Sequence, residues 1–191
     1  MNKELPFPVA IKVLKAAADI ELVLFDVDGV LTDGSLFISD DGQEYKAFYS
    51  RDGHGLKMLQ HSGVEVGIIT GRNSKAVQHR AAELGIKHLF QGRQEKLATY
   101  LSLVEELNLN PRTIAFVGDD VVDLPIMFQV GLAVAVQDAH HLVKKHAHWI
   151  TPSAGGRGAA RELCEMIMVA QGTYLTEINR FYVAPKGSVG V

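Results

Sequence analysis

The run from Leu22 to Thr32 constrains the fold of this chain more than any other feature. Apolar residues of strand type end in Asp26, and Asp28 and Gly29 follow directly. Glycine allows a sharp turn, so both carboxyls can reach one point at the end of the strand. Two carboxylates there repel each other unless a cation or a proton lies between them. The run therefore predicts a buried strand that ends in a Mg2+ site, where one aspartate can attack a phosphorus atom.

Strand-type and helix-type segments alternate along most of the chain. We expect strands at 20–26, 64–69, 88–90, 113–117, 131–136 and 148–150, and helices at 9–18, 55–62, 73–84, 94–108, 122–129, 139–146 and 159–171. Repeated strand–helix–strand units are typical of an α/β fold, with a parallel sheet covered by helices on both faces. In such sheets ligands bind beyond the carboxyl ends of the strands.

Residues 34–50 depart from this alternation and predict a β-hairpin. Two segments with apolar side chains at alternate positions flank the turn Asp40-Asp41-Gly42, and Asp-Gly in this setting is a strong hairpin signal. A two-stranded hairpin is marginally stable on its own. Its apolar side chains therefore predict packing against copies of itself in a homo-oligomer, with a surface flap on a monomer as the alternative.

Composition excludes several classes of protein. The net charge of −3 gives no basic surface for nucleic acid, and no apolar run reaches membrane-spanning length. Cys164 is the one cysteine, so no internal disulfide can form, which is typical of a reducing compartment. We expect one cytoplasmic domain over residues 1–191 with an irregular tail from about residue 182, and neither a nucleic-acid nor a membrane partner.

The polar residues at strand ends have distinct predicted roles. Asp26 is the predicted nucleophile, and Asp28 is the predicted acid that protonates the leaving oxygen and later activates water. The hydroxyl of Thr70, just past a strand, can hold phosphate oxygens. Lys96 opens a helix, where an ammonium can neutralise both phosphate and nucleophile.

A second acidic cluster follows the strand at 113–117. Asp119, Asp120 and Asp123 lie close together there, and such a cluster is electrostatically unfavourable without a cation. Asp119 is the predicted metal ligand. We expect Asp120 and Asp123 to orient the lysine or the waters of the metal.

The order of these residues resembles the four motifs of the haloacid dehalogenase superfamily. The matching elements are Asp26-x-Asp28, Thr70, Lys96 and Gly118-Asp119-Asp120-x-x-Asp123. The resemblance implies a Rossmann-like doubly wound sheet, Mg2+ and an aspartyl-phosphate intermediate. It also implies that the side chains of Asp26 and Asp119 and the backbone carbonyl of Asp28 hold the metal.

The hairpin and one short helix fill much of the interval between Asp26 and Thr70, which leaves no room for a separate cap domain. This layout resembles the cap-less 3-deoxy-D-manno-octulosonate 8-phosphate (KDO 8-phosphate) phosphatases. The matching stretches are 25–34, 49–55, 70–72, 118–125 and 155–162. The resemblance implies release of KDO and inorganic phosphate in lipopolysaccharide sugar synthesis. It also implies a homotetramer in which hairpins form a central barrel and neighbouring subunits share active sites.

The same resemblance implies a set of substrate contacts. These are Asp28, Tyr49, Ser50, Arg51, Asp52, Gly53, Lys57, Arg72, Arg80 and Lys96. The substrate carries a carboxylate as well as a phosphate, and Arg72 can clamp a carboxylate through two hydrogen bonds. Related phosphatases of nine-carbon sugar acids tend to carry glutamate at that position, so Arg72 favours KDO 8-phosphate.

Several alternatives remain open at this point. The chain can act on another sugar-acid phosphate, of the nine-carbon type. It can be a receiver-like phospho-aspartate switch, or a non-catalytic oligomeric module. The histidines show no complete set of zinc ligands with fixed spacing. The loop Gly155-Gly156-Arg157 is either an anion cradle or a mobile lead into a helix.

Overall fold

The central element of the fold is a six-stranded parallel sheet with the order β5-β4-β1-β6-β7-β8. The computed structural model describes residues 5–182 of the chain. The strands are β1 (Leu22–Phe25), β4 (Glu65–Ile69), β5 (His88–Phe90), β6 (Ile114–Gly118), β7 (Leu132–Ala135) and β8 (Trp149–Ile150). Every residue of β1, β6 and β7 is buried, as expected for inner strands covered on both faces.

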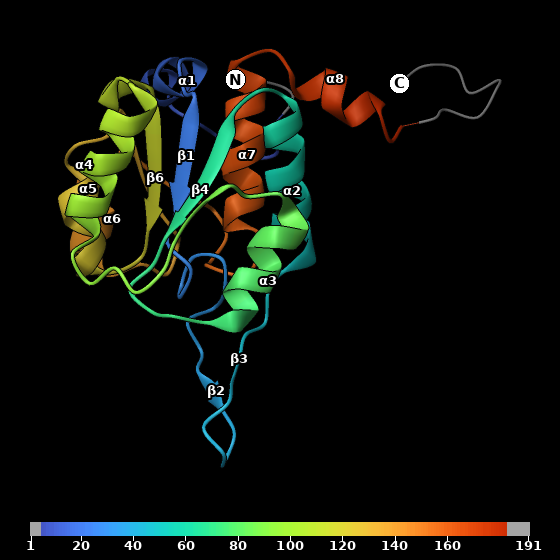
Figure 1. The fold of residues 1–191 in the computed structure, drawn as a ribbon. Helices are drawn as coiled ribbons and strands as arrows, with labels where there is room; N and C mark the ends of the chain where they lie inside the picture. The colour runs from blue at the N-terminus through green and yellow to red at the C-terminus, as the bar shows by residue number, and fades with distance from the viewer. Residues whose placement is uncertain (1–4, 183–191) are drawn as a thin grey trace.

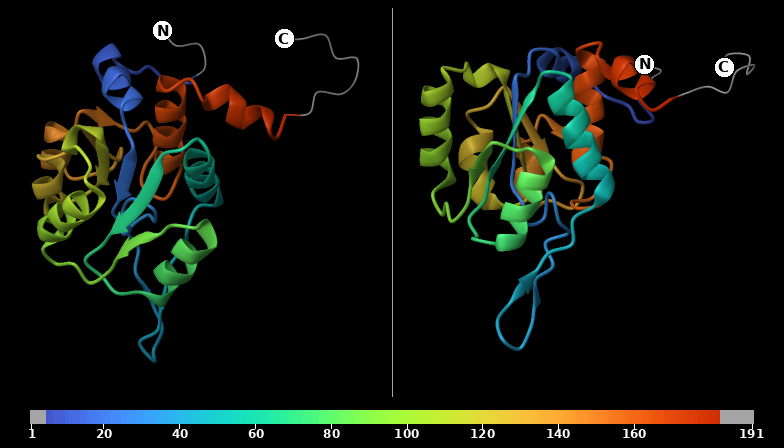
Figure 2. Two further views of the ribbon diagram at one scale, coloured as in Figure 1. Left: turned by 45° about the horizontal axis from the view of Figure 1, so that its top comes forward. Right: turned by 45° about the vertical axis from the view of Figure 1, so that its right-hand side comes forward.

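Helices cover both faces of this sheet (Figures 1 and 2). The helices are α1 (Ile11–Ala18), α2 (Ser50–His61), α3 (Lys75–Leu84), α4 (Lys96–Leu107), α5 (Leu124–Met127), α6 (His141–His146), α7 (Ala159–Ala170) and α8 (Tyr174–Asn179), with 3-10 turns at Pro111–Thr113 and Val121–Asp123. The helix α7 packs along α2 and α1 on one face, and α4, α5 and α6 lie together on the other. The predicted α/β doubly wound fold is confirmed, and residues 5–182 contain no cap domain.

A hairpin projects from the carboxyl edge of the sheet (Figure 1). Its strands β2 (Phe37–Ile38) and β3 (Glu44–Tyr45) pair antiparallel, with Phe37 opposite Tyr45 and Ile38 opposite Glu44. The hairpin is confirmed, but the paired part is shorter than the alternating sequence suggests.

The helix α2 begins at Ser50 rather than at residue 55. The reason lies in a distant segment, because the buried carboxylate of Asp52 accepts hydrogen bonds from the backbone N–H groups of Gly158 (3.3 Å) and Arg161 (2.9 Å). These bonds join the first turn of α2 to the start of α7. Burial raises the pKa of this carboxyl above its usual value.

Among the α-helices of the described residues, α8 is the one that the sequence pattern did not predict. Its buried Glu177 pairs with Arg180 (3.2 Å) and lies 4.0 Å from Nδ1 of His61 at the end of α2. The predicted irregular tail lies, from residue 183 on, outside the described residues. None of the helices in the described part of the chain has the length and apolar character needed to cross a membrane.

We predict that Tyr100→Phe stabilises the protein. Tyr100 is fully buried in α4, and its hydroxyl has no hydrogen-bond partner within residues 5–182. An unpaired buried polar group disfavours folding by about 1–3 kcal/mol, so its removal should raise the free energy of unfolding by about 1 kcal/mol. Urea unfolding should show a higher midpoint at an unchanged slope. The exposed Tyr182→Phe is the control, and a lower midpoint for Tyr100→Phe would contradict the prediction.

Candidate active site

Three neighbouring strands end at the same place and form the floor of a cavity. Asp26 follows β1, Thr70 follows β4 and Asp119 follows β6, and these strands are adjacent in the sheet. The cavity has a volume of about 210 Å3. Its lining consists of Asp26, Asp28, Thr70, Gly71, Arg72, Arg93, Gln94, Lys96, Asp119, Asp120 and Val122.

Two groups hold the carboxylate of Asp26 in this cavity. One carboxylate oxygen accepts a hydrogen bond from the backbone N–H of Val27 (2.7 Å), and the other lies 2.8 Å from Nζ of Lys96. Lys96 is buried and also donates to Oδ1 of Asp123 (2.7 Å). Burial lowers the pKa of Lys96, but the charges of Asp123 and Asp26 outweigh burial and raise that pKa above its usual value. The ammonium therefore remains charged between two carboxylates.

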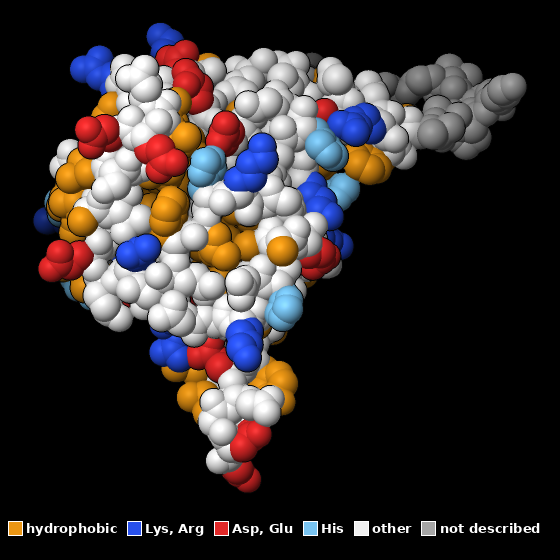
Figure 3. Space-filling model, in the orientation of Figure 1, with side chains coloured by type: hydrophobic (Ala, Val, Ile, Leu, Met, Phe, Trp, Pro, Cys, Tyr) orange, Lys and Arg blue, Asp and Glu red, His pale blue; other side chains and the backbone are white. Residues whose placement is uncertain are grey.

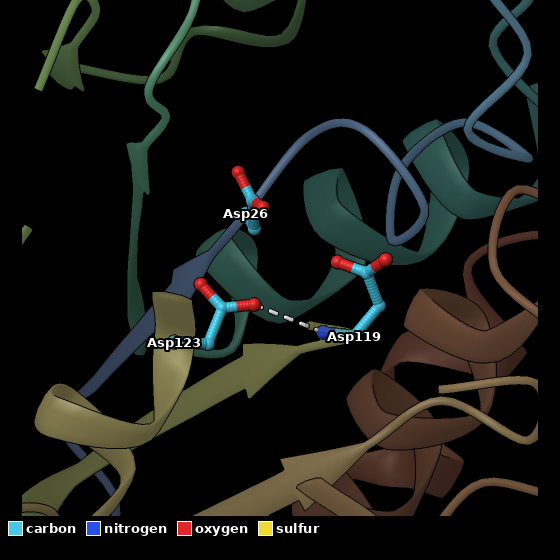
Figure 4. Close-up of side chains that lie close together, drawn as sticks. All are labelled: Asp26, Asp119 and Asp123. Atoms are coloured by element: carbon cyan, nitrogen blue, oxygen red, sulfur yellow. Dashed lines mark hydrogen bonds between the residues drawn. The ribbon is translucent and has the colours of Figure 1, made fainter. Parts of the chain in front are cut away.

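Asp123 uses both of its carboxylate oxygens within the protein. Oδ2 accepts a hydrogen bond from the backbone N–H of Asp119 (3.0 Å; Figure 4) and another from that of Asp120 (3.3 Å). A Cβ atom at Gly118 would lie 2.5 Å from the same oxygen, so glycine is needed there. These contacts place Asp123 beside Lys96, and its predicted role in orienting the lysine or the waters of the metal stays a prediction.

A group of three carboxylates has the geometry of a cation site. Ligand atoms of Asp26, Asp119 and Asp123 all lie within 4.8 Å of one another. The carboxylate of Asp119 has no hydrogen bond among the described residues. Gly29 lies close to this carboxylate, and a Cβ atom at Gly29 would be 2.1 Å from Oδ2 of Asp119. Gly29 also has a φ of +87°, so only glycine fits at this position.

The pKa values of these carboxyls show that the group lacks positive charge. Burial, and then the charges of Asp123, Asp26 and Asp120, raise the pKa of Asp119 to about 8. Burial and Asp123 raise the pKa of Asp26 to about 6, against the opposing effect of Lys96. A divalent cation with oxygen ligands would remove this repulsion, so the residues fit the predicted metal.

Several predicted site residues meet at the cavity. The carboxylate of Asp28 contacts Nζ of Lys46 and lies 3.9 Å from Nε of Arg72. Thr70 is buried, and its hydroxyl accepts a long hydrogen bond from the backbone N–H of Arg72 (3.5 Å). The structure thus brings together the predicted nucleophile, acid, hydroxyl and lysine with one of the predicted substrate cations.

Other predicted substrate contacts lie outside this cavity within one chain. Tyr49 and Arg51 line a second hollow of about 440 Å3, together with Arg157 and Arg161. Ser50, Asp52, Gly53 and Lys57 lie on α2. Arg80 lies over the ring of Phe48 (5.9 Å) and pairs with Glu83 (2.8 Å). The substrate-binding role of each of these residues stays a prediction.

Four residues at or beside the cavity lie outside the predicted site. Arg93 and Gln94 precede Lys96, and their loop is tied to β4 because the backbone N–H of Arg93 donates to the carbonyl of Thr70 (3.0 Å). Their position just before a motif lysine was a usable signal. Lys46 and Glu44 come from the hairpin, where a charged residue ordinarily indicates a solvated face.

The glycine loop before α7 packs against the loop that follows β1. The backbone N–H of Gly156 donates to the carbonyl of Val30 (2.8 Å), and a Cβ at Gly155 would lie 1.7 Å from the carbonyl oxygen of Gly29. Arg157 pairs with Asp33 (2.9 Å). These contacts hold the loop against the loop after β1, and a role as an anion cradle stays a prediction. Histidines contribute to no group of three potential metal ligands within residues 5–182.

Comparisons with known proteins agree with this geometry. Residues 88–163 match the family model of haloacid dehalogenase-like hydrolases. The chain is 49% identical to the 3-deoxy-D-manno-octulosonate 8-phosphate phosphatase KdsC of Yersinia pestis over 86% of this chain and 88% of that protein.

Two solved structures are also similar to this chain. A crystal structure of the phosphatase of the same name from Yersinia pestis has a TM-score of 0.87 at 48% identity, and covers 88% of this chain and 91% of that chain. The second is the structure of the phosphatase of the same name from Moraxella catarrhalis, in complex with magnesium, phosphate and KDO. It has a TM-score of 0.88 at 38% identity, and the match covers 90% of this chain and 98% of that chain.

We predict that Mg2+ stabilises the protein more at high pH than at low pH. Because the folded-state pKa of Asp119 is raised to about 8, the protein without a cation loses stability as pH rises toward that value and the carboxyl ionises. A cation favours the ionised form, so the increase in melting temperature on adding Mg2+ should grow from pH 6 to pH 9, reaching roughly 5 °C at saturation.

Differential scanning fluorimetry with and without Mg2+ measures this effect. Asp119→Asn should abolish both the shift and its pH dependence, whereas the exposed Asp19→Asn should retain them. An equal shift at every pH would contradict the prediction.

Proposed function

The chain belongs to the family of KDO 8-phosphate phosphatases among the haloacid dehalogenase-like hydrolases, and we propose that it hydrolyses KDO 8-phosphate to KDO and inorganic phosphate in lipopolysaccharide sugar synthesis. The observation that carries this proposal is the carboxylate of Asp26, held between a backbone N–H and Lys96 beside the cation-deficient Asp119. A carboxylate so placed suits nucleophilic attack on a phosphate monoester.

In the first step Asp26 attacks phosphorus, the bond from phosphorus to the sugar oxygen breaks, and Asp28 gives its proton to that oxygen. In the second step Asp28 takes a proton from water, the water oxygen bonds to phosphorus, and the bond to Asp26 breaks. Lys96 and the hydroxyl of Thr70 stabilise the phosphate oxygens throughout. Mg2+ held by Asp26, Asp119 and the carbonyl of Asp28 would offset the repulsion between carboxylate and phosphate.

One of the alternatives differs from this proposal in chemistry. A receiver-like switch stores its phosphate, whereas here Asp28 contributes a second carboxyl only two residues beyond Asp26, which favours turnover. Phosphatases of other sugar acids remain the second candidate, and the guanidinium of Arg72 at the cavity is the observation that favours a carboxylate-bearing substrate.

The cytoplasmic location, supported by the free, buried Cys164, stays a prediction, as does a single domain over residues 1–191.

We further propose a homotetramer assembled through the hairpin. Its side chains Leu36, Phe37, Ile38 and Tyr45 are each 49–62% exposed in a single chain. Figure 3 shows apolar side chains on both sides of the projection, below a band of charged ones. Exposed apolar groups of this size support burial against a partner. A neighbouring subunit would also place the second hollow, with Tyr49 and Arg51, beside another active site.

We predict that Asp26→Asn abolishes turnover, by about 10⁴-fold or more, because an amide is not a nucleophile for phosphorus. Phosphate release is measured with KDO 8-phosphate, other sugar-acid phosphates and hexose phosphates, with Mg2+ present. Asp19→Asn should be fully active. A strong preference of the unaltered protein for KDO 8-phosphate supports the proposed substrate, and a flat profile contradicts it. Turnover by a folded Asp26→Asn protein would contradict the nucleophile.

We predict that the double substitution Phe37→Ser and Ile38→Ser dissociates the oligomer and lowers activity at least tenfold, because two apolar side chains leave the interface. Light scattering after gel filtration gives the mass of the particle. Asp40→Asn in the same hairpin is the control and should leave a tetramer. A variant that stays tetrameric would refute the role of the hairpin.

A further inference from the structure

Lys46 is nearly inaccessible to solvent although it lies on the projecting hairpin. Its side chain is 1% exposed, while the neighbouring Tyr45 is 59% exposed. A buried ammonium requires partners. Its partners are the carboxylate of Asp28 and Oε1 of Glu44, at 3.0 Å. The base of the hairpin therefore places a desolvated cation directly on the predicted catalytic acid.

Four side chains, alternately acidic and basic, form a closed ring at this point. Glu44 contacts Lys46 and also NH2 of Arg72, and Nε of Arg72 lies 3.9 Å from Oδ2 of Asp28. The hydrogen bond from Arg72, together with Lys46, holds the pKa of Glu44 below its usual value, so its charge is retained. The ring joins the loop after β1, the strand β3 and the loop after β4.

Asp28 depends on this ring for its orientation. Asp26 is fixed by a backbone N–H and by Lys96, but within residues 5–182 the carboxylate of Asp28 contacts only Lys46 and, at longer range, Arg72. A general acid contributes only when its proton lies within hydrogen-bond reach of the leaving oxygen. The direction of this carboxyl thus depends on a lysine from the hairpin.

We propose that Lys46 is a positioning residue for the reaction, which holds Asp28 where it can transfer a proton to the leaving group, with Glu44 holding Lys46 in turn. The inference rests on the proposed phosphatase chemistry and adds the hairpin to it. Proton transfer matters most when the leaving group is a poor one. Replacement of Lys46 should therefore slow hydrolysis most for the substrates whose leaving oxygen most needs a proton.

The test compares p-nitrophenyl phosphate, whose leaving group departs without help, with phenyl phosphate and KDO 8-phosphate, which need a proton. Values of kcat/KM are used because they report the steps up to departure of the leaving group. Lys46→Met should lower kcat/KM at least about tenfold for the two demanding substrates and less than threefold for p-nitrophenyl phosphate. Lys12→Met, an exposed lysine on α1, is the matched control.

A second arm separates positioning from a structural role. In an Asp28→Asn background, Lys46→Met should cause no further loss with phenyl phosphate, because the group on which it acts is gone. Equal losses for all substrates, or additive losses in the double variant, would overturn the proposal. Lys46→Gln serves if Lys46→Met does not fold. The two aryl phosphates test the role of Lys46 even if KDO 8-phosphate is not cleaved. Failure of the proposed substrate is therefore distinguishable from failure of the proposed role of Lys46.

Discussion

Repulsion among carboxylates at the ends of β1 and β6 is the constraint on which the rest of this structure depends. Asp26 and Asp123 share the buried ammonium of Lys96, which is positioned by the first turn of α4. Asp119 has no such partner, and burial beside its neighbours raises its pKa to about 8. The site therefore combines a proposed nucleophile, whose charge is offset by Lys96, with a carboxyl that favours a cation, and both features suit attack on an anionic ester.

The hairpin takes over part of what a cap domain would otherwise supply. A cap excludes water and orients the substrate, and residues 5–182 contain none. Here the base of the hairpin supplies buried charges to the rim of the cavity, while its outer part exposes apolar side chains. The hairpin thus connects the proposed assembly surface to Asp28, the proposed acid, through the few residues in and next to strand β3.

The parallel sheet and the strand ends that carry the predicted site residues could be predicted from sequence because each depends on local patterns. Apolar runs that end in Asp26, Thr70 and Asp119 indicate the parallel strands directly. Two features could not be predicted in this way. The start of α2 depends on backbone donors that come from α7, more than one hundred positions away. The burial of Lys46 depends on the contacts of the hairpin base with Asp28 and Glu44, and alternation in sequence does not encode that geometry.

The hydrogen bonds of Asp52 also bear on how the protein is made. The first turn of α2, which carries several predicted substrate contacts, is joined to backbone N–H groups of Gly158 and Arg161. During synthesis the N-terminal part of a chain emerges and folds first. The strands β1 and β4 can therefore associate early, whereas this turn gains its partners only when the last third of the chain has left the ribosome. A nascent chain that has not yet reached residue 158 would therefore lack these two hydrogen bonds to the first turn of α2.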